Sequence, residues 1–418
     1  MNAPLHPSLA RAAGAGAHPL GGRSGFSSCT MDEALDRARA LVGTLRERAS
    51  AAEALRQPLP ETVEDLHASG LLRCVQPRRW GGMELPFESL VRIPAELARG
   101  CASTAWALGN WAIHHWMLAL YDEKAQQEVW DADPEALIAS GIAYPQGAAR
   151  RVSGGVVLSG FWNFSSGVDA SPWNMLAAIV KEDERPVDYL ICLVPRSDYT
   201  IVDDWNVLGM SGTGSKSVKA QEVFVPGHRA LSMLRARGGR EFPGAAVHSN
   251  PLYSISLASM GTHCLVGVAI GNAEAALEYT TASMSQRVSS YQQLGLRELP
   301  TVHQRVANAA SRIDAARALA LEDCARAQLE AAEGRIPNLE GKLRPKRNVA
   351  YAAQLCTEAV DSLHGLAGAN GIYQSGPMQR IFRDAHALTG HFGFNADAHA
   401  LAWGAVQLGA AYKAPATL

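Results

Sequence analysis

Apolar residues in the first third of the chain recur three or four positions apart, the spacing that predicts amphipathic helices. Thr30 and Glu33 form a Thr-x-x-Glu capping box, so we expect a helix to begin at Thr30. A second helix should begin at Pro60, because proline is favoured in a first helical turn. From 87 to 121 the helical stretch is apolar on most sides, which indicates burial. The apolar residues that mark the first helix are Leu35, Ala38, Leu41, Val42 and Leu45.

Between 137 and 225 the apolar runs become short and rich in β-branched residues. Glycine, proline and aspartate separate the runs, as in turns between strands. This region is therefore predicted to form an antiparallel sheet or a small barrel. The clearest strand patterns are 156–158, 175–180, 189–194 and 218–225.

Helical periodicity returns near 252 and continues to the end in four segments, with breaks near 288–300, 332–339 and 369–376. Four helices with short connections predict an antiparallel bundle. We therefore expect a mainly α protein with a middle β domain. The expected divisions are a disordered tail (1–29), an N-terminal helical domain (30–135), a middle antiparallel β domain (136–245) and a C-terminal four-helix bundle (246–418).

Net charge, apolar runs and cysteine spacing exclude several classes of binding partner. The chain of 418 residues has a formal net charge of −2, which argues against nucleic acid or a membrane surface. The sequence holds no apolar run of about eighteen residues, so we expect no membrane-spanning helix. Seven cysteines, never spaced as Cys-x-x-Cys, favour buried thiols in a reducing cytoplasm over disulfides or a zinc site.

Glycines, arginines and a histidine gather between 364 and 394, near the end of the chain. Glycine lets the backbone approach a ligand closely. Arg380, Arg383 and Asp384 follow on a predicted helix, and His391 supplies a titratable group at the next break in the pattern. This combination favours a cofactor site over a solvated surface.

A second candidate is the aromatic segment Gly-Phe-Trp-Asn-Phe-Ser-Ser-Gly (160–167). Its Ser-Ser-Gly end could present hydroxyl and backbone N–H groups to a planar ring; the alternative is a strand end over a buried aromatic cluster. His114 stands in an apolar helix, where a packed neutral histidine is the common alternative to a ligand-binding one. The glycines of 209–214 favour a β-turn over a dinucleotide loop. Zinc-protease, α/β-hydrolase and P-loop motifs are absent from the sequence.

Six motifs, in their order along the chain, resemble the acyl-CoA dehydrogenase superfamily over about 31–409. The resemblance implies a helical domain, a middle β domain and a C-terminal four-helix bundle, with flavin bound between them. The motifs are Pro-Arg-Arg-Trp-Gly-Gly (77–82), Ala-Ser-Thr-Ala-Trp (102–106), Trp-Asn-Phe-Ser-Ser-Gly (162–167), Asp-Trp-Asn-Val-Leu-Gly-Met-Ser-Gly-Thr-Gly-Ser (204–215), Val-Phe-Val-Pro (223–226) and Gln-Arg-Ile-Phe-Arg-Asp (379–384).

One departure from the superfamily indicates the branch. Many of its dehydrogenases carry Tyr-Glu-Gly-Thr shortly after the Arg-Asp pair, and that glutamate removes the substrate proton. Here the stretch is His-Phe-Gly-Phe (391–394), and Phe392 cannot remove a proton. A histidine at this place is similar to the reduced-flavin monooxygenases of the same fold (group D), such as the oxygenase of p-hydroxyphenylacetate hydroxylase and dibenzothiophene monooxygenase.

The resemblance implies the oxygenase component of a two-component flavin monooxygenase. Such an enzyme uses reduced flavin and O2, through a C4a-hydroperoxyflavin, to oxygenate a small aromatic or heteroaromatic substrate. His391 is then expected to be a proton donor with a near-neutral pKa, and Ser166 to hydrogen-bond the flavin. We choose Ser166 over Ser165 because it directly precedes Gly167, and His114 is expected to bind or deprotonate a phenol. The aromatic residues of 161–173 are expected to exclude water.

The same resemblance assigns Arg287, Asn370 and Gly371 to the flavin phosphate, with Gly167 and Phe392 also at the cofactor. Some relatives carry arginine in place of Asn370, and the pyrophosphate contact of Tyr-Glu-Gly-Thr is missing, which favours reduced FMN over FADH2. The implied partners are a separate flavin reductase, O2, a small aromatic substrate and further copies of the chain in a tetramer or dimer.

Two alternatives remain from the sequence. The first is an acyl-CoA dehydrogenase with a relocated base, such as Glu135 or Asp361, which would hold FAD tightly. The second is a non-catalytic helical-bundle interaction protein, which would bind no flavin.

Overall fold

A computed structural model describes residues 25–289 and 293–418. The predicted tail (1–29) therefore lies almost wholly outside the described residues. The expected first helix is confirmed: α1 begins after Thr30, whose side chain accepts from the Glu33 N–H while the Glu33 carboxylate accepts from the Thr30 N–H. The N-terminal helices are α1 (Met31–Leu55), α2 (Pro60–Ser69), α3 (Ser89–Ala98), α4 (Ala102–Leu118) and α5 (Glu123–Trp130).

The predicted apolar stretch 87–121 forms α3 and α4 with a break at Gly100. A Cβ on Gly100 would lie 2.6 Å from the Val42 carbonyl oxygen of α1, so the break occurs where the two backbones meet. Nearly every residue of α4 is buried, as its composition predicts.

The middle of the chain forms one eight-stranded sheet in the order β6-β7-β3-β2-β4-β5-β8, with β1 paired to β4. Most pairs are antiparallel, as expected, but β1 and β2 each run parallel to β4. Alternation along one strand gives no information on such pairings. The strands are β1 (Ile138–Gly141), β2 (Gly147–Val152), β3 (Gly155–Ser165), β4 (Trp173–Glu182), β5 (Arg185–Pro195), β6 (Thr200–Val202), β7 (Lys216–Pro226) and β8 (Ala230–Ser232).

The C-terminal helices of the described chain follow the predicted breaks, with two additions, the first of which is a short helix that ends at Met260. The fourth predicted segment divides into two helices at Gly390, and Asn395 caps the last one. The helices are α6 (Leu257–Met260), α7 (His263–Gln286), α8 (Pro300–Ala332), α9 (Leu339–Ala367), α10 (Met378–Thr389) and α11 (Ala396–Gln407).

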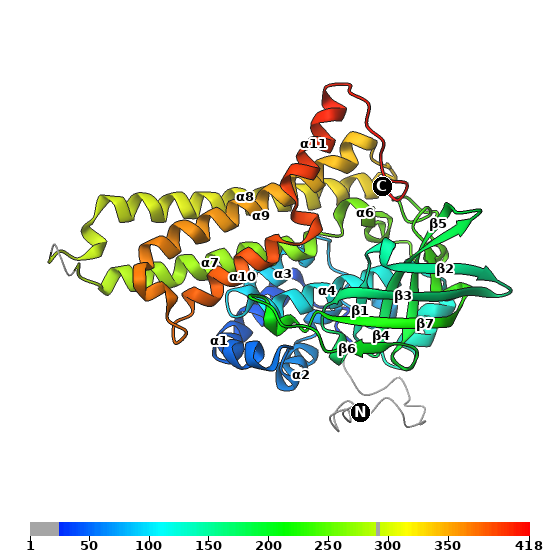
Figure 1. The fold of residues 1–418 in the computed structure, drawn as a ribbon, viewed down its shortest axis with the longest axis horizontal. Helices are drawn as coiled ribbons and strands as arrows, with labels where there is room; N and C mark the ends of the chain where they lie inside the picture. The colour runs from blue at the N-terminus through cyan, green and yellow to red at the C-terminus, as the bar shows by residue number, and fades with distance from the viewer. Residues whose placement is uncertain (1–24, 290–292) are drawn as a thin grey trace.

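Figure 1 shows α7, α8 and α9 as long rods on one side and the sheet on the other, with α3 and α4 between them. The N-terminal helices and the bundle share one continuous core, while the sheet has a second core of its own. α4 contacts β1 as well as α7, so its side chains lie where the three parts of the chain meet. The fold is the mainly α architecture with a middle sheet that the sequence predicts.

Candidate functional site

The Ser166 hydroxyl lies in a buried chain of hydrogen bonds at the end of β3. Trp106 of α4 donates its indole N–H to Ser166 Oγ at 3.2 Å. Ser166 Oγ is 2.7 Å from Ser215 Oγ, which is 2.7 Å from Thr213 Oγ1. When Thr213 donates to Ser215 and Ser215 donates to Ser166, the Ser166 proton is free for a ligand.

His391 contacts the same tryptophan, Trp106, and so lies next to this row of hydrogen-bonded side chains. Its ring lies edge-on to Trp106, with centroids 5.6 Å apart. His391 Nδ1 accepts the Gly393 N–H at 3.1 Å, so the ring proton of the neutral form is on Nε2. Burial, and to a smaller extent the charge of Lys346, lowers the pKa of His391 to about 4. The ring is therefore a neutral hydrogen-bond donor at pH 7 and not the near-neutral acid that the sequence suggested.

Two exposed phenylalanines flank the pair. Phe164, 67% exposed, precedes the serines in a left-handed conformation with φ 65°, and Phe392, 61% exposed, lies with its ring centroid 4.4 Å from that of His391. Large apolar side chains that are exposed to solvent beside buried polar groups are typical of a surface that binds an aromatic ring. Trp162, which was also expected to exclude water, is instead buried in the core of the sheet and donates to the Ala177 carbonyl.

Ser165 and Gly167 have structural positions. The Ser165 hydroxyl points into the sheet and accepts from Asn174 at 3.0 Å, which agrees with the choice of Ser166. The Gly167 N–H donates to the Thr213 carbonyl and is not available to a flavin. Gly167 has φ 69°, and a Cβ there would lie 2.5 Å from the Trp111 ring, so glycine is needed for the turn.

His114 lies two turns beyond Trp106 on α4. It is 2% exposed, and its Nδ1 lies 2.5 Å from the Ile138 carbonyl oxygen of β1. Because a carbonyl only accepts, Nδ1 carries the proton and Nε2 keeps its lone pair. Burial lowers the pKa of His114 to about 4, so this neutral ring can accept a hydrogen bond from a phenol.

Arg287, Asn370 and Gly371 lie together but away from Ser166. The Arg287 guanidinium donates to the Ala367 carbonyl at 3.4 Å, just before the turn that contains the other two. Arg287 caps the C-terminus of α7, whereas Gly393 lies against Thr262 at its N-terminus. The 24 residues of α7 separate the two groups by about 36 Å, at 1.5 Å per residue. One chain does not bring both groups to one flavin.

Arg380, Arg383 and Asp384, which the sequence placed at a cofactor, hold the domains together. Asp384 accepts the Met210 N–H at 2.6 Å, and Arg383 donates to the Leu208 carbonyl at 2.6 Å. These bonds fix the loop that carries Thr213 and Ser215. Arg380 donates to Ser50 of α1 in the same way. The loop itself forms a short turn before β7, as predicted, and not a dinucleotide site.

The alternative bases are engaged elsewhere. Glu135 is buried 3.8 Å from Arg73, and Asp361 lies 2.8 Å from His386 on the surface of the bundle. All seven cysteines are buried and unpaired, as expected. In the ranges that the structure describes, no cluster of metal-ligating side chains and no helix able to cross a membrane is found.

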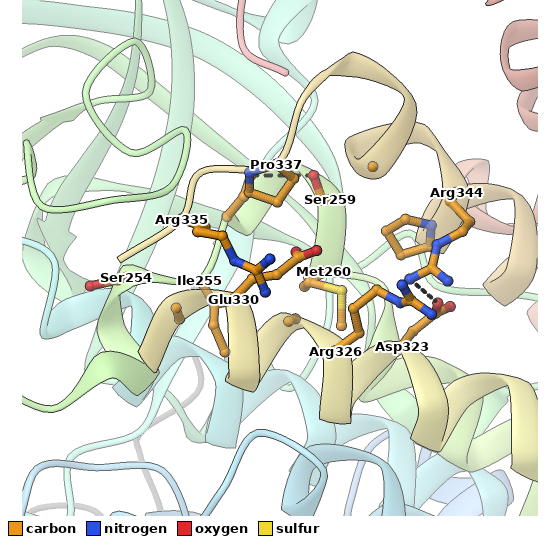
Figure 2. Close-up of a pocket in the computed structure, with 15 residues that line it drawn as sticks. Ser254, Ile255, Ser259, Met260, Asp323, Arg326, Glu330, Arg335, Pro337 and Arg344 are labelled. Atoms are coloured by element: carbon orange, nitrogen blue, oxygen red, sulfur yellow. Dashed lines mark hydrogen bonds and ion pairs between the residues drawn. The ribbon is translucent and has the colours of Figure 1, made fainter. Parts of the chain in front are cut away.

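A pocket between α6, α8 and the start of α9 lies outside this group of residues (Figure 2). Three arginines and two acids face it: Arg326, Arg335, Arg344, Asp323 and Glu330. Asp323 is buried beside His263, at 3.5 Å, and beside Arg344, also at 3.5 Å. No local sequence pattern predicts this charged pocket, because its residues come from α6, α8, α9 and the connection between the last two.

The Ser166–His391 group fits a flavin. A hydroxyl with a free proton, a neutral imidazole and two open phenyl rings match a planar heterocycle that is polar at its edge and apolar on its face. Arg287, the cation that the resemblance assigns to the flavin phosphate, lies at the other end of α7.

Comparison with known proteins agrees with this geometry. Residues 31–132 match the acyl-CoA dehydrogenase N-terminal domain and residues 263–396 the acyl-CoA dehydrogenase C-terminal domain. The chain is 36% identical over 358 residues to the flavin-dependent monooxygenase oxygenase subunit HsaA of Rhodococcus jostii, covering 84% of this chain and 92% of that protein. It is 35% identical over 383 residues to the FADH(2)-dependent resorcinol hydroxylase oxygenase component of a Rhizobium species, covering 89% and 93%.

The crystal structure of a 3-HSA hydroxylase from Rhodococcus superposes with a TM-score of 0.86 at 32% identity. The superposition covers 92% of this chain and 99% of that one. The similarity therefore extends over the helices and the sheet together.

Proposed function

This chain belongs to the acyl-CoA dehydrogenase family, among its flavin-dependent monooxygenase oxygenase subunits, and from this premise we propose that it oxygenates a small aromatic or heteroaromatic substrate. One observation carries the proposal. Trp106 joins the Ser166 hydroxyl to the neutral His391 ring, and Phe392 follows where a dehydrogenase has its carboxylate. The group offers hydrogen bonds and apolar cover, and its polar members hold no base able to remove a proton from an acyl thioester.

Reduced flavin bound here would supply the electrons that activate O2. The Ser166 hydroxyl would hold the polar edge of the ring, and Phe164 and Phe392 would cover its face and exclude water. His391 Nε2–H would donate a hydrogen bond to the reacting oxygen, since its proton stays on the ring at pH 7. His114 Nε2 would accept the proton of a phenol hydroxyl in a hydrogen bond.

The remaining cofactor residues are assigned to a second copy of the chain. The length of α7 separates Arg287, Asn370 and Gly371 from Gly393, the neighbour of His391, by about 36 Å. These residues would therefore bind the phosphate of a flavin held by a neighbouring copy. The assembly is then at least a dimer, and a tetramer satisfies the same geometry. We infer a cytoplasmic enzyme from its seven unpaired cysteines.

We propose reduced FMN as the preferred flavin, with FADH2 as the second candidate. Asn370 adds no positive charge for a pyrophosphate, and the Rhizobium relative is named for FADH(2). Titration of the protein with each reduced flavin, in the absence of oxygen, distinguishes the two.

The function is tested with a separate flavin reductase, NADH, O2 and a library of small aromatics. Oxygenated product should form only when all components are present, and Ser166→Ala should release more hydrogen peroxide per product. Ser165→Ala is the matched control, because that hydroxyl faces Asn174 in the sheet. Reduction of a tightly bound FAD by an acyl-CoA, with no oxygenated aromatic, would establish the dehydrogenase instead.

A further inference from the structure

Lys346 of α9 lies beside the Ser166–His391 group without a counter-ion. Its ammonium donates to the Ala258 carbonyl of α6 at 3.0 Å. Four residues later Thr262 packs against Gly393, whose N–H is bound by the His391 ring. The Lys346 ammonium, the end of α6 and His391 therefore converge. The positive charge of Lys346 also lowers the pKa of His391, although burial has the larger effect.

No carboxylate among the described residues lies within salt-bridge distance of Lys346 Nζ. Burial lowers the pKa of Lys346, and no neighbouring acid opposes this. Lys216, another largely buried lysine, shows the usual arrangement, with Asp169 at 2.9 Å and Asp203 at 3.5 Å. An ammonium shielded from water without an acid is unfavourable unless an anion joins it. Lys342, one turn earlier, is also without an acid in the described chain, so it is the position of Lys346 beside Ala258 and His391 that indicates a ligand contact.

The other polar groups near Lys346 also lack anions. His399 of α11 is affected by the same ammonium, but one ring nitrogen donates to the Phe392 carbonyl, so its buried Nε2, which has no partner in the described chain, is an acceptor. One turn later the Trp403 ring lies under Arg347, with the guanidinium carbon 4.1 Å from the ring centroid. The indole N–H of Trp403 is buried without a partner in the same part of the chain. The Trp403 indole is therefore an unpaired donor beside Arg347, and an anion would supply its missing acceptor.

We propose that Lys346 is the specificity-determining cation of the substrate site and that the substrate is an aromatic compound bearing a carboxylate. This inference rests on the proposed function, since it places the substrate ring between Lys346 and the Ser166–His391 group. The ammonium binds the carboxylate and leaves the ring to be oxygenated near His391.

The test uses pairs of ligands that differ only in charge. The pairs are para-hydroxybenzoate, para-hydroxyphenylacetate and para-hydroxyphenylpropionate, each with its amide, so the distance from ring to carboxylate varies. Calorimetric binding to the wild-type protein should favour the acid of at least one pair by about tenfold, since charge-assisted hydrogen bonds are roughly twice as strong as neutral ones. Lys346→Met should reduce that preference to within about twofold, and Lys346→Arg should retain it.

Lys342→Met is the matched control, because Lys342 lies one turn earlier on α9 and its charge faces Arg237 instead of His391. It should keep the preference. Equal binding of acids and amides by the wild type, or a preference that survives in Lys346→Met, would overturn the proposal. An equal loss of the preference for the acid in Lys342→Met would also overturn it, because the selectivity would then come from the summed positive charge of α9 and not from Lys346. Lys346→Gln provides a second uncharged variant if Lys346→Met does not fold.

Turnover separates this inference from the function on which it rests. If neutral phenols are oxygenated with reduced flavin but no acid is preferred, the monooxygenase stands and the role of Lys346 fails. If no aromatic is oxygenated, the proposed function itself fails, whatever the calorimetry shows.

Discussion

Replacement of Asp384 by asparagine should stabilise the protein at neutral pH. Asp384 is 5% exposed and accepts the Met210 N–H, and its burial raises the carboxyl pKa from 3.8 to about 6. The native state therefore binds the proton more tightly than the unfolded chain does. Stability should fall as pH rises through this range and stay lower above it.

The difference between 3.8 and about 6 corresponds to about 3 kcal/mol, at about 1.4 kcal/mol per tenfold change. The amide of the Asp384→Asn variant would keep the oxygen that accepts from Met210 and remove the buried charge. This variant should therefore raise the free energy of unfolding at pH 8 by at most about 3 kcal/mol. Below about pH 4 the carboxyl is protonated in both states, so the gain should vanish.

Urea unfolding from acidic to alkaline pH measures this difference. Asp384→Ala should instead lose stability by about 1–3 kcal/mol, because the Met210 N–H would be left without an acceptor. Asp36→Asn, at an exposed pair with Arg39, should change little at any pH. An Asp384→Asn variant that is less stable than wild type at pH 8 would refute the reasoning, since the charge would then contribute more than its burial costs.

Three further outcomes follow from the site. Replacing His391 by alanine should increase the hydrogen peroxide formed per product. His386→Ala, at the exposed pair with Asp361, should leave that ratio unchanged. Equal ratios in the two variants would remove His391 from the mechanism. Gly167→Ala should lower the free energy of unfolding by about 2 kcal/mol or more relative to Gly154→Ala. Gly154 also has a positive φ but has open space around it. Equal losses would mean that the Trp111 ring moves to make room for the new methyl group. Ser166→Ala and Arg287→Glu should each lose activity, and a mixed assembly of the two variants should partly regain it. In that assembly some sites combine the intact Ser166 of one copy with the intact Arg287 of the other. No recovery would mean that both residues belong to the site of one chain.

The sequence predicts the order of helices and strands because local signals mark them. The Thr30–Glu33 box and Pro60 define where α1 and α2 begin, and the structure confirms both. The division of the last segment into α10 and α11 was missed, although Gly390 and Asn395 mark it. The parallel pairing of β1 and β2 with β4 depends on contacts between strands far apart, which no local pattern encodes.

The sequence predicts a site residue correctly where the residue type suits the role and the fold also places it at the site. Ser166 and His391 come together as the family resemblance implies, but only the structure shows Trp106 between them. Arg383 and Asp384 have the composition of a cofactor motif and instead bind backbone groups across a domain boundary. Lys346 gave no signal, because a Lys-Arg pair on a helix is typical of a solvated face until Ala258 and His391 are placed beside it.

If Ser166 contacts the flavin as proposed, the three hydroxyls that end at Ser166 would let one side chain serve both oxidation states of that cofactor. Each link from Thr213 through Ser215 can reverse its polarity by rotation of the O–H bonds, with no movement of oxygen atoms. In one sense Ser166 offers a proton, and in the other it offers a lone pair. An oxidised flavin nitrogen needs the first and a reduced N–H needs the second. In the proposed flavin site the backbone would then stay fixed while the hydrogen-bond polarity of Ser166 follows the redox state of the flavin.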